Sequence, residues 1–171
     1  GGELEDFSRI ISSLLNKYSR NEKNILSSNA LKSVFNKYSN ALSTLNTTKK
    51  IITDKMPLNF QYIGFIFLAF PEAKVINLNR DARATCWSIY KHYFSDLGNG
   101  YSYNLEDLVK FYALYDDLMN FWHQLYPNKI YDICYEDLTT NQEAETRKLL
   151  KYCELEWDEN CLHFEMNERA V

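Results

Sequence analysis

The chain has 171 residues with 19 basic and 23 acidic side chains, a formal net charge of −4, which argues against the extended basic face of a nucleic-acid-binding domain. Its longest apolar run, Ile63 to Phe70, is far shorter than the roughly 20 residues of a membrane-spanning helix, and the sequence does not open with a basic and apolar leader. We therefore expect a cytoplasmic protein without nucleic-acid or membrane partners. At 46% hydrophobic content, one domain over residues 1–171 is the simplest expectation.

Two amphipathic helices are predicted at the N-terminal end. Apolar residues recur with a helical period from Leu4 to Tyr18 and again from Leu31 to Leu45, and Ser27 or Ser28 is placed to cap the second helix.

The rest of the chain alternates between strand and helix patterns. The predicted elements are a short strand at 50–55, a helix at 56–70 with Pro57 in its first turn, a strand at 73–79, helices at 81–94 and 105–122, a strand at 129–135, a helix at 140–153, and an irregular tail. This alternation predicts an α/β fold with a doubly wound parallel sheet.

The cysteines do not indicate a metal site. Cys86, Cys134, Cys153 and Cys161 form no C-x-x-C pair, and only Cys161 has a histidine nearby. We expect four buried free thiols that act as small apolar side chains.

The segment VINLNRDARATCWSIY, residues 75–90, places two arginines and two hydroxyl side chains where a strand ends and a helix begins. In parallel sheets ligands bind outside the carboxyl ends of the strands, next to helix N-termini. Arg80 stands there with a planar fork of donors that matches phosphate oxygens, and Ser88 follows two helical turns later. The alternative is an Arg80 paired with Asp81 or another carboxylate and a solvated Ser88.

The segment NRDARATCWS resembles the 3′-phosphate-binding segment of sulfotransferases, which has Arg-Asp at a strand end and Ser eight positions after the Arg. Residues 53–90, from TDKMP onward, resemble the bacterial sulfotransferases often joined to tetratricopeptide repeats, which are related to tyrosylprotein sulfotransferases. Residues 132–164, which begin DICYEDL, resemble the later strand, helix and Trp-containing tail of the same family.

The resemblance implies transfer of a sulfuryl group from 3′-phosphoadenosine-5′-phosphosulfate to an acceptor hydroxyl by in-line displacement, without a metal. Arg80 and Ser88 would bind the 3′-phosphate, Lys55 would reach the 5′-phosphosulfate, and Tyr135 would lie beside the cosubstrate. Glu3, in a short Gly-Glu segment similar to that of the tyrosylprotein branch, would be the general base.

From the residues alone, other interpretations of these side chains stay open. Lys55 could be a solvated lysine before a helix, Glu3 a carboxylate near a helix start, and Tyr135 a packed aromatic side chain. His92 follows Ser88 by one turn, but its surroundings do not match the histidine motif of other sulfotransferase branches.

One family motif is missing from the sequence. Sulfotransferases carry a loop resembling G-x-P-R-S-G-T after their first strand, and this chain has no such stretch. The resemblance places that loop before Gly1 and a further pocket segment after Val171. We therefore expect a fragment with a P-loop-NTPase-like parallel sheet that lacks its first strand, inactive alone, with a possible homodimer through the exposed sheet edge.

Two other functions compete with this hypothesis. A non-catalytic relative would bind adenosine 3′,5′-bisphosphate or a protein partner, and a P-loop small-molecule kinase would need Mg²⁺ ligands beside a phosphate loop. The acceptor stays open among carbohydrates, lipids, peptide tyrosines and small metabolites.

Overall fold

The computed structural model describes residues 4–19, 26–45, 51–94, 98–163 and 166. The chain divides into two compact units, residues 1–73 (unit 1) and residues 74–171 (unit 2), and each is described by itself. The expected single domain stays a prediction.

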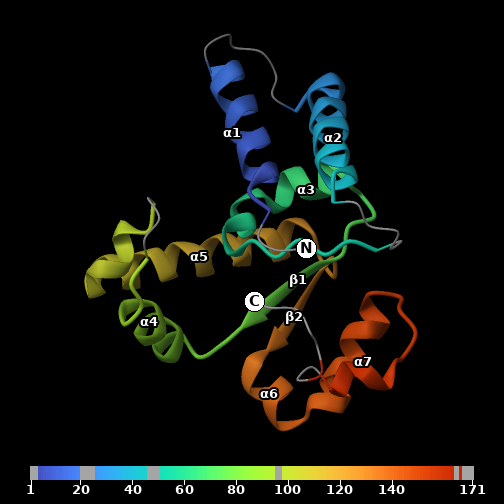
Figure 1. Cartoon of the computed structure of the whole chain (residues 1–171). Coiled ribbons are helices and arrows are strands. Elements are labelled where there is room, and N and C mark those ends of the chain that lie inside the picture. The colour runs from blue at the N-terminus through green and yellow to red at the C-terminus, as the bar shows by residue number, and fades with distance from the viewer. Residues whose placement is uncertain (1–3, 20–25, 46–50, 95–97, 164–165, 167–171) are drawn as a thin grey trace. The chain divides into compact units, whose positions relative to one another are not determined.

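Unit 1 is built on two helices that pack side by side, α1 (Asp6–Ser19) and α2 (Ser28–Ser43) (Figure 1). Both agree with the predicted amphipathic helices, and Ser27 is the N-cap of α2, where its side chain accepts a hydrogen bond from the Ala30 N–H at 3.3 Å. A short helix, α3 (Ile63–Ala69), packs against α2 and contributes Ala69 to the core of this unit. The buried members of that core are Phe7, Ile11, Val34, Tyr38 and Ala69.

The predicted strand at 50–55 is wrong, since residues 51–56 adopt no regular secondary structure. A strand forms only beside another strand, and no described residue pairs with this segment. Side chains hold it instead, because Asp54 accepts hydrogen bonds from the Tyr38 hydroxyl at 2.7 Å and from the Leu4 N–H at 3.4 Å. Pro57 does begin a helix, but the turn is the 3₁₀ helix η1 (Pro57–Tyr62), which precedes α3.

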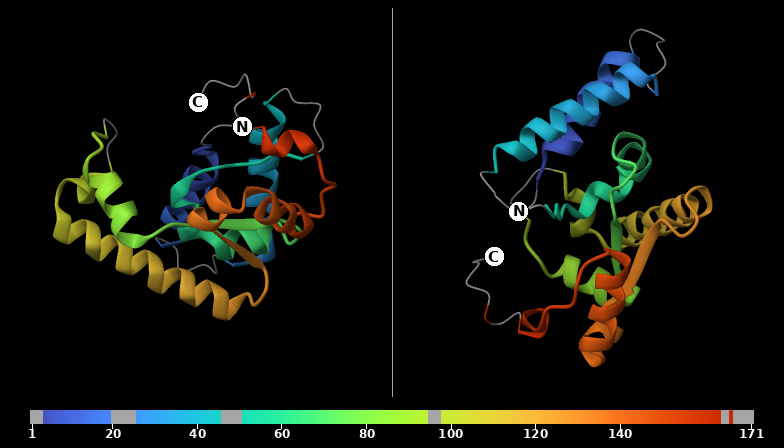
Figure 2. Two further views of the ribbon diagram at one scale, coloured as in Figure 1. Left: turned by 90° about the horizontal axis from the view of Figure 1, so that it is seen from below. Right: turned by 90° about the vertical axis from the view of Figure 1, so that its right-hand side faces the viewer.

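Unit 2 contains the sheet, which among the described residues has two parallel strands, β1 (Val75–Asn79) and β2 (Ile130–Cys134). Figure 1 shows them side by side. Its helices, in chain order, are α4 (Ala82–Tyr90), η2 (Gly100–Tyr103), α5 (Leu105–Leu125), α6 (Tyr135–Thr140), α7 (Gln142–Tyr152) and η3 (Glu159–Leu162). Both α4 and η2 pack against α5 (Figure 2). The α/β class and the parallel pairing are confirmed.

The two faces of the sheet differ in polarity and in the helix that packs on them. On the face toward α5, the Tyr115 hydroxyl lies 2.9 Å from Asn77 Oδ1. On the other face, Tyr131 stacks on Tyr152 of α7 with ring centroids 5.0 Å apart. Ile76 and Leu78 on that face are 44% and 57% exposed, so α7 covers this face of β1 only in part.

Two helix boundaries depart from the sequence prediction. Helix α4 ends at Tyr90 rather than at Phe94, and the six-residue helix α6, directly after β2, was not predicted. All four cysteines are free thiols, as expected, but the expected burial is wrong, since each is only partly buried. Over the stretches that the structure describes, no helix is both long and apolar enough to cross a membrane.

Candidate functional site

The candidate site lies at the carboxyl ends of the two strands. Asn79, the last residue of β1, is paired in register with Cys134, the last residue of β2. Because the strands are parallel, the residues that follow them emerge at the same edge of the sheet. The Arg80–Asp81 segment therefore meets the Tyr135–Glu136 segment, although 55 positions separate Arg80 from Tyr135 in the sequence.

Arg80 and Tyr135 are brought together by this geometry. The guanidinium carbon of Arg80 lies 5.0 Å from the centroid of the Tyr135 ring, a cation–π distance. Both side chains are exposed, Tyr135 to 40%. The ring accepts no conventional hydrogen bond from the guanidinium in this contact, so Arg80 can still donate its N–H groups to an anion.

The alternative interpretation, Arg80 paired with Asp81 or another carboxylate and a solvated Ser88, agrees with the structure in one respect, because Ser88 is exposed. Asp81, however, forms no ion pair with Arg80. The Asp81 side chain caps helix α4, where it accepts a hydrogen bond from the Ala84 N–H at 2.8 Å. This contact satisfies one of the N–H groups that helices leave unpaired at their start. The carboxylate of Asp81 is thus engaged with the start of α4 and not with the Arg80 guanidinium.

Glu136 is a residue of this site that sequence reasoning missed. One of its carboxylate oxygens accepts a hydrogen bond from the Asp81 N–H at 3.1 Å, and the other accepts one from Cys134 Sγ at 3.2 Å. These two hydrogen bonds, with a smaller contribution from the positive charge of Arg80, lower the pKa of Glu136. Its position in the sequence could have indicated this role, because Glu136 directly follows Tyr135 at the end of β2, the strand beside β1.

A polar network on the α5 face of the sheet fixes the residue before Arg80. Asn79 donates from its amide nitrogen to Asp132 at 3.2 Å, and its amide oxygen lies 3.0 Å from the Tyr115 hydroxyl. His123 Nε2 of α5 lies 3.1 Å from the other oxygen of Asp132. The chain is thus anchored on both sides of Arg80, at Asn79 by side chains and at Asp81 by its backbone.

The other predicted site residues are placed as follows. Ser88 is exposed on α4, and it follows Asp81 by seven residues, which puts both on the same side of the helix. Lys55 is exposed two residues before the start of η1, but it belongs to unit 1 and is not placed relative to Arg80. Glu3 lies outside the described residues.

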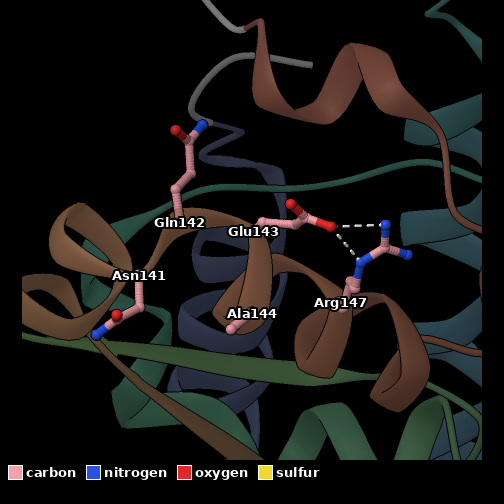
Figure 3. A pocket seen from close by; sticks show the side chains of 5 residues that line it. All are labelled: Asn141, Gln142, Glu143, Ala144 and Arg147. Atoms are coloured by element: carbon pink, nitrogen blue, oxygen red, sulfur yellow. Dashed lines mark hydrogen bonds and ion pairs between the residues drawn. The ribbon is translucent and has the colours of Figure 1, made fainter.

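A separate hollow of about 490 Å³ lies at the start of α7, lined by Asn141, Gln142, Glu143, Ala144 and Arg147. Figure 3 shows Arg147 turned toward Glu143, and Arg147 donates to this carboxylate from two nitrogens at 2.8 and 2.7 Å. The guanidinium of Arg147 also lies 3.7 Å from the ring centroid of Trp157. Its charge is already matched, and none of the predicted site residues lines this hollow.

At the strand ends of this α/β protein, an arginine at the carboxyl end of one parallel strand meets an aromatic residue at the end of the next, the edge where parallel sheets commonly bind ligands. Comparison with known families is more specific. Residues 5–159 match the model of the sulfotransferase family, and the chain belongs to that family.

The chain is also similar to individual proteins, two of which are named sulfotransferases. The chain is 34% identical over 143 residues to an uncharacterized protein of Aquifex aeolicus (strain VF5), a match that covers 82% of this chain and 19% of the relative. It is 25% identical over 114 residues to the protein-tyrosine sulfotransferase of Drosophila melanogaster and 24% identical over 114 residues to protein-tyrosine sulfotransferase A of Caenorhabditis elegans. These two matches cover 67% of this chain and 23% and 30% of the relatives, so the chain spans less than a third of each of these relatives.

Proposed function

We propose that this chain is the 3′-phosphate-binding part of a sulfotransferase that uses 3′-phosphoadenosine-5′-phosphosulfate. Family membership supports this proposal, and one observation carries it: Arg80, in the motif that resembles the family's 3′-phosphate segment, lies at the carboxyl end of β1 beside Tyr135 at the end of β2. Arg80 and Tyr135 are 55 positions apart in the sequence, and they lie in contact at the edge where parallel sheets bind ligands.

Each residue of the proposed site has one role. Arg80 offers parallel N–H donors to the 3′-phosphate and Ser88 adds a hydroxyl, while the exposed Tyr135 ring flanks the nucleotide. Lys55, before a helix that starts with proline, would carry positive charge to the 5′-phosphosulfate, where the leaving phosphate develops negative charge. Glu3 would take the acceptor proton.

The proposed reaction is a single displacement. The cosubstrate supplies the sulfuryl group: its sulfur–oxygen bond to the 5′-phosphate breaks while the acceptor oxygen bonds to sulfur. The acceptor's proton passes to Glu3, and adenosine 3′,5′-bisphosphate leaves. Two relatives are named protein-tyrosine sulfotransferases, so a tyrosine-containing peptide is the acceptor to test first. We expect no transfer by this chain alone, because its sequence contains no G-x-P-R-S-G-T-like loop for the 5′-phosphosulfate.

The binding step is tested by calorimetry with adenosine 3′,5′-bisphosphate. The variant Arg80→Ala should bind about thirtyfold more weakly than the parent chain, because a lost charge-assisted hydrogen bond costs about 2 kcal/mol. Adenosine 5′-monophosphate, which lacks the 3′-phosphate, should bind the parent and Arg80→Ala equally.

A matched control is Arg83→Ala, which removes an exposed arginine from the first turn of the same helix. This control should leave affinity within about twofold of the parent, because the charge of an exposed side chain is screened by water and salt. Equal loss in Arg83→Ala and Arg80→Ala would show that general positive charge, not the proposed site, holds the nucleotide.

A further inference from the structure

Beside the proposed nucleotide site, Glu136 bridges the two strand ends. It accepts the Asp81 N–H at 3.1 Å and the thiol of Cys134 at 3.2 Å, so one carboxylate contacts the chain after β1 and the end of β2. The residue between Asn79 and Asp81 is Arg80, and its side chain lies over the ring of Tyr135, the neighbour of Glu136.

We propose that Glu136 is a positioning residue that fixes the backbone at Asp81 and thereby holds Arg80 over Tyr135, in the orientation that receives the 3′-phosphate. This inference rests on the proposed function. Its basis is the pair of contacts from Glu136 together with the Arg80 to Tyr135 contact. The side chain does not touch the nucleotide itself in this proposal.

If Glu136 acted only through its negative charge, it would lower nucleotide affinity, whereas the proposed positioning role raises it. A carboxylate near a phosphate repels it, so a Glu136 that acted only through its charge would weaken nucleotide binding, and its removal would strengthen binding. A Glu136 that holds the Asp81 backbone improves binding, because the arginine is ordered before the ligand arrives. The sign of the change in affinity therefore distinguishes the two roles.

The experiment compares Glu136→Ala and Glu136→Gln in calorimetry with adenosine 3′,5′-bisphosphate. Glu136→Ala removes the acceptor and should weaken binding about fivefold, less than Arg80→Ala, because Arg80 remains but is no longer ordered before the ligand arrives. Glu136→Gln keeps an acceptor oxygen for the Asp81 N–H and removes the charge, so it should bind at least as tightly as the parent. The matched control Asp137→Asn alters the adjacent exposed carboxylate and should leave affinity unchanged.

A double-mutant cycle tests whether Glu136 acts through Arg80. If it does, the double variant Arg80→Ala with Glu136→Ala should bind no more weakly than Arg80→Ala alone. Additive losses would overturn the inference, as would an affinity of Glu136→Ala equal to or above that of the parent. Equal losses in Glu136→Ala and Glu136→Gln would also overturn it, because the acceptor oxygen would then be irrelevant.

A measurement without ligand separates this inference from the proposed function. In NMR spectra the Arg80 side-chain protons should be shifted upfield by the Tyr135 ring, and this shift should vanish in Glu136→Ala but persist in Glu136→Gln. An unchanged shift in Glu136→Ala would refute the positioning role whatever the nucleotide affinity. If Arg80→Ala leaves nucleotide affinity unchanged, the proposed function fails; if only Arg80→Ala weakens binding, this inference alone fails.

Discussion

The Tyr115 hydroxyl provides a quantitative test of the polar network behind the site. It lies 2.9 Å from the amide oxygen of Asn77 and 3.0 Å from that of Asn79, but it carries one proton and donates to one of them at a time. The variant Tyr115→Phe therefore loses about one hydrogen bond, worth about 1 kcal/mol of unfolding free energy. In this variant the Asn79 amide oxygen still accepts a hydrogen bond from the Asn77 amide nitrogen at 3.0 Å, so it is not left without a donor. The total loss of unfolding free energy should therefore not exceed about 2 kcal/mol.

The assay is urea unfolding, with thermal unfolding as a second measure. For a chain of this length, a loss of 1 kcal/mol should lower the melting temperature by about 2–4 °C. The matched control is Tyr112→Phe, which removes a hydroxyl from a partly buried tyrosine of the same helix and should change stability by less than about 0.5 kcal/mol. Equal stability of Tyr115→Phe and the parent would refute the network, as would equal losses in both variants.

Two further predictions concern pH and backbone geometry. Burial, followed by the hydrogen bond to Asp54, raises the pKa of Tyr38 well above its ordinary value, so the folded chain favours the protonated phenol. This stabilisation should be complete below about pH 10 and should decline as the pH rises further, where the unfolded chain ionises first. Urea unfolding across that range should show the alkaline decline in the parent and a smaller one in Tyr38→Phe; equal declines would contradict the assignment. Asn128, between α5 and β2, has a φ of 61°, in the left-handed region. Asn128→Ala should be less stable than Asn128→Gly by about 1 kcal/mol, because a Cβ is disfavoured there, and equal stabilities would show that the turn relaxes.

Elements with strong local patterns could be predicted from the sequence. The apolar repeat from Leu105 onward predicted α5, and the pair Ser27 and Ser28 marked the start of α2, with Ser27 as the cap in the structure. The β-branched residues of 73–79 and 129–135 predicted both strands, and their parallel pairing followed from the helices between them. That pairing also predicts that Arg80 and Tyr135 emerge at one edge.

Features that depend on tertiary neighbours could not be predicted. Residues 51–55 have the β-branched content of a strand, but no described strand pairs with them, and the contact of Asp54 with Tyr38 determines their path instead. Helix α6 is only six residues long, which is too short for an apolar period to appear. The partners of Asn79 depend on register, which places Asp132 on the same sheet face.

The central claim is that the edge formed by Arg80 and Tyr135 binds the 3′-phosphate of the cosubstrate. A crystal structure of this chain with adenosine 3′,5′-bisphosphate tests it most directly. We predict the 3′-phosphate at hydrogen-bonding distance, about 2.7–3.2 Å, from the Arg80 guanidinium and the Ser88 hydroxyl, with the Tyr135 ring beside the nucleotide. A nucleotide bound instead in the hollow at Arg147, with Arg80 and Ser88 both in solvent, would contradict the claim.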